Sequence, residues 1–104
     1  MEQNNKLIIL QPARDDIFDI TNYHQLISGA SSALEIAREI KHALSLLKEF
    51  PLMGTVHDDP LLAKQGYRKF RINKFYACTY KVFDNVVYIY TVTYNNKQKT
   101  GILN

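Results

Sequence analysis

The sequence of 104 residues is poor in several features, and each shortage excludes a class of protein. Its single cysteine, Cys78, cannot form an intramolecular disulfide, which is typical of a chain in a reducing compartment. Only four glycines and three prolines accompany 46% hydrophobic residues, unlike the composition of disordered or low-complexity chains. No apolar run approaches the ~20 residues of a membrane span, and residues 1–6 lack the features of a secretory signal. We therefore expect one cytoplasmic domain over residues 1–104, with no membrane association.

Charge is distributed unevenly along the chain. Residues 1–62 carry five basic and nine acidic side chains, whereas residues 63–104 carry eight basic and one acidic. This asymmetry indicates that one surface meets an anionic partner. Scattered, solvated charges are the alternative explanation.

The first half of the sequence has the pattern of a strand followed by a helix. Residues 6–10 form an apolar run long enough for one buried strand. A helix is predicted from about 12 to 28, with proline at its first position and Asp15 and Asp16 near its positive end. Gly29 ends it. Its apolar stripe consists of Ile17, Ile20, His24 and Ile27.

A second helix is predicted immediately afterwards. Ser32 precedes Glu35 by three residues, the spacing of a capping box. The helix is expected to stop at Phe50, because Pro51 disfavours helical geometry in the residue before it. Two helices separated by so short a break form an antiparallel hairpin.

The second half of the sequence has the composition of a sheet. Residues 51–66 contain two prolines and two glycines and are predicted to be a loop. Six of the seven tyrosines follow within residues 67–94. Turns at Asn73-Lys74 and Asp84-Asn85 divide this region into strands at about 67–72, 75–83 and 86–94.

The predicted architecture is an α+β two-layer domain with the element order β-α-α-β-β-β. The first strand must join the same sheet as the others, because an isolated strand leaves its backbone groups unpaired. The helix hairpin then packs on one face of a mainly antiparallel, four-stranded sheet, and the other face stays at least partly open.

Several ordered motifs together resemble those of a known family. The second predicted helix ends Leu46-Leu47-Lys48-Glu49-Phe50-Pro51, with Gly54 after it. Gly66-Tyr67-Arg68-Lys69-Phe70-Arg71-Ile72 comes next, then Tyr76-Ala77-Cys78-Thr79-Tyr80-Lys81-Val82 and Val86-Val87-Tyr88-Ile89-Tyr90-Thr91-Val92. Over nearly the whole chain, this set resembles the RelE/ParE superfamily of bacterial type II toxins. The resemblance implies a growth-inhibiting toxin paired with a small antitoxin.

The resemblance implies one of two modes of action. RelE-like members cleave messenger RNA on the ribosome, and they carry basic residues at positions matching Arg68 and Phe70 and an arginine at the position matching Ala77. They also carry a further arginine, where this chain has Asn95-Asn96, and a late tyrosine or histidine. Only Arg68 is retained in type. Because the loss of one positioned cation typically costs about 10²–10³ in rate, we favour the ParE-like mode, in which the toxin binds DNA gyrase.

Three hypotheses follow. The first is a ParE-like toxin that binds gyrase and is neutralised by a cognate acidic antitoxin. The second is an endoribonuclease that acts on ribosome-bound mRNA with a non-standard set drawn from Arg68, Lys69, Arg71, Tyr76, Tyr94, Lys97 and Lys99. The third is an inactive relative kept as an interaction module. No cofactor or metal is expected, because the three histidines show no paired spacing and only one cysteine is present.

The candidate site residues lie mostly in the basic segment around residues 68–74 and in the tail after residue 93. The catalytic candidates are Arg68, Arg71 and Tyr94, and the candidates for target binding are Lys69, Arg71, Lys74, Asn96, Lys97 and Lys99. On a strand, Lys69 and Arg71 share one face, whereas Arg68 lies on the other and is expected to be partly enclosed. A charged edge strand is the alternative explanation for this basic segment.

The aromatic and nucleophilic candidates have simpler explanations. Tyr80, Tyr88 and Tyr90 are predicted to be core residues. Tyr88, Tyr90 and Tyr94 are expected to share one strand face. Cys78 is predicted to be an inert core thiol. His57 lies in a solvated loop, with the alternative role of a general base.

Overall fold

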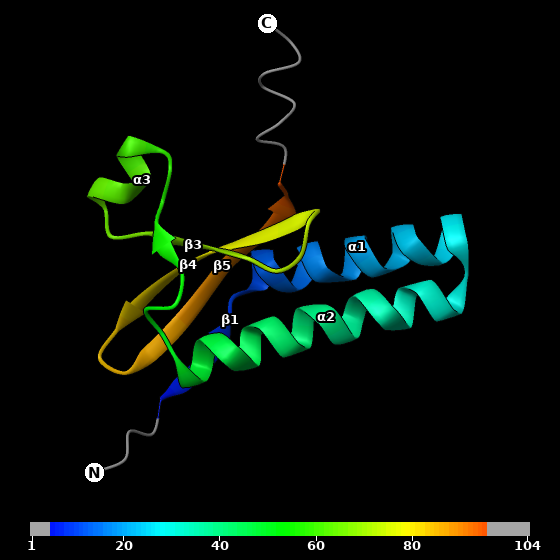
Figure 1. The fold of residues 1–104 in the computed structure, drawn as a ribbon, viewed down its shortest axis with the longest axis horizontal. Coiled ribbons are helices and arrows are strands. Elements are labelled where there is room, and N and C mark those ends of the chain that lie inside the picture. The colour runs from blue at the N-terminus through cyan, green and yellow to red at the C-terminus, as the bar shows by residue number, and fades with distance from the viewer. Residues whose placement is uncertain (1–4, 96–104) are drawn as a thin grey trace, which may run out of the picture.

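The computed structural model describes residues 5–95 as a helical hairpin packed against one face of a five-stranded sheet (Figure 1). In chain order, the elements are β1 (Lys6–Ile9), α1 (Gln11–Ser28), α2 (Ala30–Glu49), β2 (Thr55–Val56), α3 (Pro60–Lys64), β3 (Arg68–Arg71), β4 (Tyr76–Phe83) and β5 (Val86–Tyr94). The strand order is β1-β5-β4-β3-β2, with β1 parallel to β5 and every other pair antiparallel. The α+β class, the hairpin and the mainly antiparallel sheet are confirmed.

The expected number of four strands is too small, because the predicted loop 51–66 contains a strand and a helix. Thr55 and Val56 form β2 by pairing with Lys69 and Arg68 of β3. A two-residue strand has no detectable alternation, so its pairing is fixed by the neighbouring strand. Asp59 then caps α3, and its Oδ1 accepts from the Leu61 N–H at 2.9 Å.

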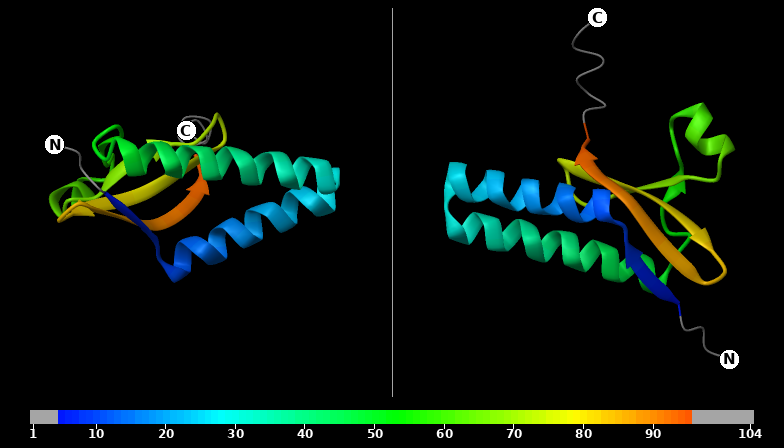
Figure 2. Two further views of the ribbon diagram at one scale, coloured as in Figure 1. Left: turned by 90° about the horizontal axis from the view of Figure 1, so that it is seen from below. Right: turned by 180° about the vertical axis from the view of Figure 1, so that it is seen from behind.

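The second helix of the hairpin, α2, starts without the predicted capping box. Gly29, at φ 94°, is the single residue between the helices, and α2 begins at Ala30 with no side-chain cap. Ser32 therefore lies inside the helix. Glycine is favoured at this point because other residues rarely adopt positive φ. Figure 2 shows that the hairpin extends well past the sheet, with the connection between its helices at the far end.

The two aspartates predicted to interact with the helix dipole have other partners, because α1 begins at Gln11 and has no acidic residue in its first turn. Gln11 Nε2 donates to Asp15 Oδ1 at 2.9 Å. Asp16 Oδ2 accepts from the backbone N–H of Val92 at 2.9 Å. Since β1 pairs with β5 only as far as Ile89, Asp16 satisfies an edge group that no strand reaches.

The core lies between the hairpin and one face of the sheet. Its fully buried side chains include Tyr80, which confirms that prediction. The core cluster consists of Ala13, Ile36, Ile40, Leu44, Leu47, Tyr76, Cys78, Tyr80, Val87, Ile89 and Val92.

Two other tyrosine predictions are wrong. Tyr88 and Tyr90 flank the fully buried Ile89, so alternation places them on the opposite face, where they are only partly buried. A bulge then changes the register: Tyr80 pairs with Ile89, whereas Thr79 pairs with Thr91. As a result, Tyr94 does not share their face, and it lies opposite Tyr76 on the side of the helices.

The segment after α2 is fixed by a close contact with the sheet. The Gly54 N–H donates to Tyr80 Oη at 3.0 Å, and Tyr80 Oη donates to the Pro51 carbonyl at 2.8 Å. A Cβ atom on Gly54 would lie 2.5 Å from the Lys69 carbonyl oxygen and 2.6 Å from Tyr80 Oη. This contact explains why glycine stands three residues after Pro51.

Candidate functional site

The face of the sheet that points away from the helices, hereafter the open face, carries the predicted basic strand. Lys69 pairs with Thr79, and Arg71 pairs with Ala77, so both basic side chains lie at one end of this face. Lys69 Nζ forms an ion pair with Asp58 Oδ2 at 3.2 Å. The Lys69 side chain is 25% exposed and that of Asp58 is 50% exposed, so solvent screens the pair.

Arg71 is held by a residue at the end of β5. With the Asn95 amide oxygen facing the guanidinium, Arg71 Nε and Nη2 donate to it at 3.2 and 3.0 Å. A hollow of about 250 Å³ lies beside these groups, lined by Met53, Gly54, Thr55, Asp58, Lys69, Phe70, Arg71 and Asn95. We call this hollow the basic end of the open face.

Arg68 is partly enclosed, as expected, and it is engaged in the fold. Its Nη2 donates to the carbonyl oxygens of Gly54 at 2.8 Å and Leu52 at 3.2 Å. Its Nε is buried without a hydrogen-bond partner. The guanidinium therefore anchors the segment that leads into β2, and it points away from Lys69 and Arg71.

His57 also reaches the open face. Its Nδ1 accepts from the Asp59 N–H at 3.0 Å, so in this arrangement the proton of the neutral ring is on Nε2. Nε2 lies 3.3 Å from Thr79 Oγ1. Both ring nitrogens thus have partners, and the ring braces the loop before α3 against β4.

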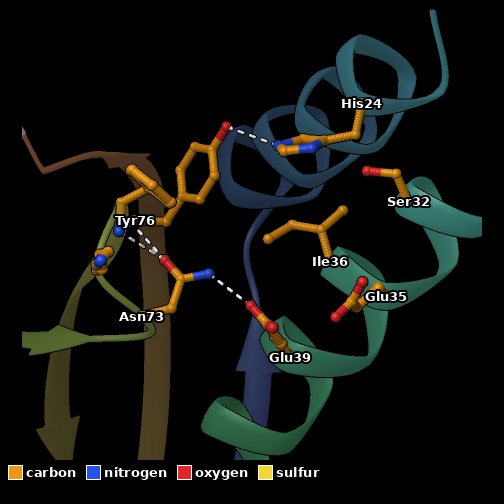
Figure 3. Close-up of a pocket in the computed structure, with 9 residues that line it drawn as sticks. His24, Ser32, Glu35, Ile36, Glu39, Asn73 and Tyr76 are labelled. Atoms are coloured by element: carbon orange, nitrogen blue, oxygen red, sulfur yellow. Dashed lines mark hydrogen bonds between the residues drawn. The ribbon is translucent and has the colours of Figure 1, made fainter. Parts of the chain in front are cut away.

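The predicted residues Lys74 and Tyr76 belong to a second site, which we call the hairpin cleft. This cleft of about 340 Å³ separates the hairpin from the β3–β4 turn (Figure 3) and is lined by His24, Ser32, Glu35, Ile36, Glu39, Asn73, Lys74, Phe75 and Tyr76. Lys74 is therefore separated from Lys69 and Arg71, and its Nζ lies 5.9 Å from the centroid of the Phe75 ring.

Two hydrogen bonds cross the hairpin cleft, as Figure 3 shows. His24 Nε2 lies 3.1 Å from Tyr76 Oη, and Asn73 Nδ2 donates to Glu39 Oε1 at 2.6 Å. Burial raises the pKa of Tyr76, and Tyr23 and Tyr94 act in the same direction. Tyr76 is therefore a neutral hydroxyl at physiological pH.

Tyr94 borders the hairpin cleft through its contacts with Phe75 and Tyr76, on the face of the sheet opposite to that of Arg71. Its ring is stacked on Phe75 at 6.3 Å between centroids and meets the edge of Tyr76 at 5.8 Å. Phe75 and Tyr94 are 51% and 53% exposed, so they extend the apolar lining of the cleft to the surface.

Asn96, Lys97 and Lys99 lie outside the described residues. Within residues 5–95, no group of three or more His, Cys, Asp and Glu side chains is placed to hold a metal ion. No helix among them is long and apolar enough to cross a membrane.

Sequence reasoning missed the acidic and amide partners of these sites. Asp58, Glu39 and Asn73 are contributed by segments distant in sequence from the groups they bind. The only available signal was the Asn73-Lys74 turn itself, because Asn73 Oδ1 accepts from the N–H groups of Phe75 and Tyr76.

The helical hairpin on a five-stranded sheet, together with a family match over most of the chain, places the protein in the RelE/ParE superfamily of toxins. The family model described as "ParE toxin of type II toxin-antitoxin system, parDE" matches residues 7–99, so the chain belongs to that family. The fold is similar to a solved structure described as "Chromosomal ParDE TA system from P. aeruginosa". The TM-score is 0.76 at 16% sequence identity, over 89% of this chain and 98% of that one. No curated protein matches the sequence.

Proposed function

We propose that this ParE-family toxin inhibits growth in the cytoplasm by binding DNA gyrase, without cleaving a substrate. The observation that carries the proposal is the engagement of those candidate catalytic cations that lie within residues 5–95. Arg68 binds two backbone carbonyls, Arg71 binds Asn95, and Lys69 pairs with Asp58. Phosphoryl chemistry requires a base, an acid and cations directed at one point, whereas these groups are directed at the protein itself.

We propose further that a cognate acidic antitoxin neutralises the toxin. The hairpin cleft offers an apolar lining at Ile36, Phe75 and Tyr76. Tyr23, Leu26 and Ile27 on the neighbouring tip of α1 are 57%, 84% and 65% exposed. An exposed apolar surface of this kind is typical of a protein interface. Acidic residues of the antitoxin would match the basic end of the open face.

One induction experiment separates the hypotheses. The toxin is expressed in bacteria, with and without the small protein encoded beside it, while DNA damage signalling and messenger RNA integrity are followed. We expect growth arrest with DNA damage signalling, intact mRNA and rescue by the neighbouring protein. Rapid cleavage of ribosome-bound mRNA would instead establish the endoribonuclease, and normal growth would leave an inactive interaction module.

A matched pair of variants tests which surface binds gyrase. In a supercoiling assay with purified gyrase, we expect the double variant K69A/R71A to lose at least about tenfold in inhibitory potency. Truncating charged contacts of this kind costs about 1.4 kcal/mol or more. K41A, an exposed charge on α2, serves as the control and is expected to inhibit as the wild type does. Equal inhibition by K69A/R71A would show that gyrase binds elsewhere.

A further inference from the structure

The half of the open face opposite the basic end holds a hollow that none of these functions uses. It measures about 430 Å³ and is lined by Gln65, Gly66, Lys81, Val82, Phe83, Tyr88 and Tyr90. We call it the tyrosine hollow. Its size lies within the range of small-molecule sites, and its lining contains three aromatic rings and one lysine but no carboxylate.

The aromatic rings that line the tyrosine hollow lie outside the core and keep part of their surface exposed. Tyr88 lies between Lys81 of β4 and Ile8 of β1, and Ile8 is 40% exposed. Phe83 is 71% exposed. Tyr90 is fixed edge-on against Tyr67, with 4.9 Å between centroids and an interplanar angle of 82°. The Tyr67–Tyr90 pair therefore forms a rigid wall, beside which Tyr88 and Phe83 present partly free surfaces.

The cation of the hollow is positioned as well. Lys81 Nζ lies 4.5 Å from the centroid of the Tyr67 ring, within the range of a cation–π contact. Burial raises the pKa of the Tyr90 hydroxyl, and the neighbouring Tyr67 and Tyr88 act in the same direction. The hydroxyl therefore stays neutral at physiological pH, so Lys81 is the charged group of the hollow's lining.

A flat ring joined to a phosphate is the ligand chemistry that matches this combination. We propose that the tyrosine hollow binds a nucleotide, with its base stacked on Tyr88 and its phosphate near Lys81. Base–aromatic stacking tolerates any base, because every base has a π-face. An acidic peptide could form an ion pair with Lys81, but it has no flat ring to stack on the aromatic side chains.

The site is distinct from the positions at which the RelE-like resemblance implies catalysis. Phe70 and Ala77 do not line the tyrosine hollow, and Asn95 lines the basic end. On the open face, Lys69 of β3 lies beside Thr79 of β4, and Lys81 lies two residues further along β4. A nucleotide that is part of single-stranded nucleic acid would therefore find further cations for its next phosphates. A free nucleotide would use the hollow alone. The inference does not depend on gyrase being the target.

The test is a titration of the purified, ¹⁵N-labelled full-length chain, followed by amide chemical shifts. The probes are AMP, ribose 5-phosphate, an octamer of deoxythymidylate and an octamer of glutamate. We expect AMP to shift amides around Tyr88 and to bind between about fivefold and a hundredfold more tightly than ribose 5-phosphate, as one stacked base predicts. Equal affinity for the two, absence of shifts, or equal binding of the glutamate octamer would overturn the proposal.

Variants separate stacking from a loss of structure. Y88F keeps the ring and is expected to bind AMP like the wild type, whereas Y88A is expected to lose the advantage of AMP over ribose 5-phosphate. K81Q is expected to weaken both ligands and to reduce the dependence on salt. Y23A removes an exposed tyrosine on α1 and serves as the control. Equal effects of Y88A and Y23A would overturn the assignment.

The octamer identifies the source of the nucleotide. If it binds more tightly than AMP and loses only that excess in K69A/R71A, the ligand is a single strand. If it binds no more tightly than AMP, the ligand is a free nucleotide. Both results support stacking in the tyrosine hollow, whereas an octamer whose binding is unchanged in Y88A contradicts it.

Discussion

At the scale of single residues, identical side chains take different roles according to strand register. Arg68 and Arg71 lie three residues apart on β3, and alternation sends them to opposite faces. Arg68 is turned toward the end of α2, where it binds two carbonyls, while Arg71 remains on the open face beside Asn95. The contacts that Arg68 makes with the fold therefore account for a basic residue at position 68.

Gly54 provides the sharpest prediction at this scale. In G54A, the added methyl group would meet the Lys69 carbonyl and Tyr80 Oη, neither of which can move without breaking the contact between β3 and the 51–54 segment. We expect a loss of about 3 kcal/mol in the free energy of unfolding, measured with urea, as is usual for overpacking.

The matched control for this change is G29A. There the methyl group meets nothing within 4 Å, and only the positive φ is strained. The expected loss is about 1 kcal/mol. If G54A is no less stable than G29A, the close approach at Gly54 does not hold in solution.

Cys78 is expected to be unreactive in the folded protein. Its side chain is fully buried, and burial raises the pKa of the thiol from 9.0 to about 12. Alkylation by iodoacetamide at pH 8 should therefore be slow in buffer and fast in urea, as measured by mass spectrometry. Fast labelling of the folded chain would contradict this.

The same shift has a consequence for stability. Because the pKa of the Cys78 thiol is higher in the folded state than in the unfolded chain, the folded state is favoured as long as the thiol is protonated in both. This contribution to the free energy of unfolding is complete below pH 9 and is lost as the pH rises toward 12. In C78A this particular decline should be absent, so comparing the two proteins over that interval isolates it from the titration of the tyrosines.

At the scale of elements, the sequence predicts those elements whose signals are local. The strands at 76–83 and 86–94 follow from composition and from the Asp84-Asn85 turn, whose residues adopt φ 53° and 65°. β2 could not be predicted, because two residues become a strand only when β3 lies beside them. The bulge near Tyr90 was equally invisible, and it reversed the predicted face of Tyr94. The sequence predicted the positive charge of Lys69 and Arg71. It could not predict that Asp58 and Asn95 bind them, because these pairs form only in the tertiary structure.

The contact of α1 with β5 through Asp16 gives a prediction at this scale. D16A leaves the N–H of Val92 without its acceptor. We expect a loss of about 1.5–3 kcal/mol in unfolding free energy, the range for a hydrogen bond to a charged group. D16N retains an acceptor and should lose less. D19A, at an exposed position on the same helix, should be close to neutral. Equal losses in D16A and D19A would show that this bond does not contribute.

At the scale of the whole molecule, the net charge of +3 conceals two surfaces with different chemistry. The hairpin and its cleft combine the carboxylates of Glu35 and Glu39 with exposed apolar side chains. The open face combines lysine and arginine with tyrosine. The apolar contact proposed for the antitoxin lies on the hairpin, whereas the contact proposed for gyrase lies on the open face. A substitution confined to the tip of the hairpin should therefore weaken antitoxin binding without changing the inhibition of gyrase.

Ile27 tests this independence. It is 65% exposed near the tip of α1, so I27D should not disturb folding, yet it places a charge in the apolar surface proposed for the antitoxin. We expect antitoxin affinity, measured by calorimetry, to fall at least tenfold, as for other central apolar contacts. Inhibition of gyrase should be unchanged, because Ile27 lies on the hairpin and not on the open face. S45D introduces the same charge at an exposed position of α2 and should affect neither measurement. If I27D retains full antitoxin affinity, the tip of the hairpin is not part of that interface, and if it also loses gyrase inhibition, the two surfaces are not separate.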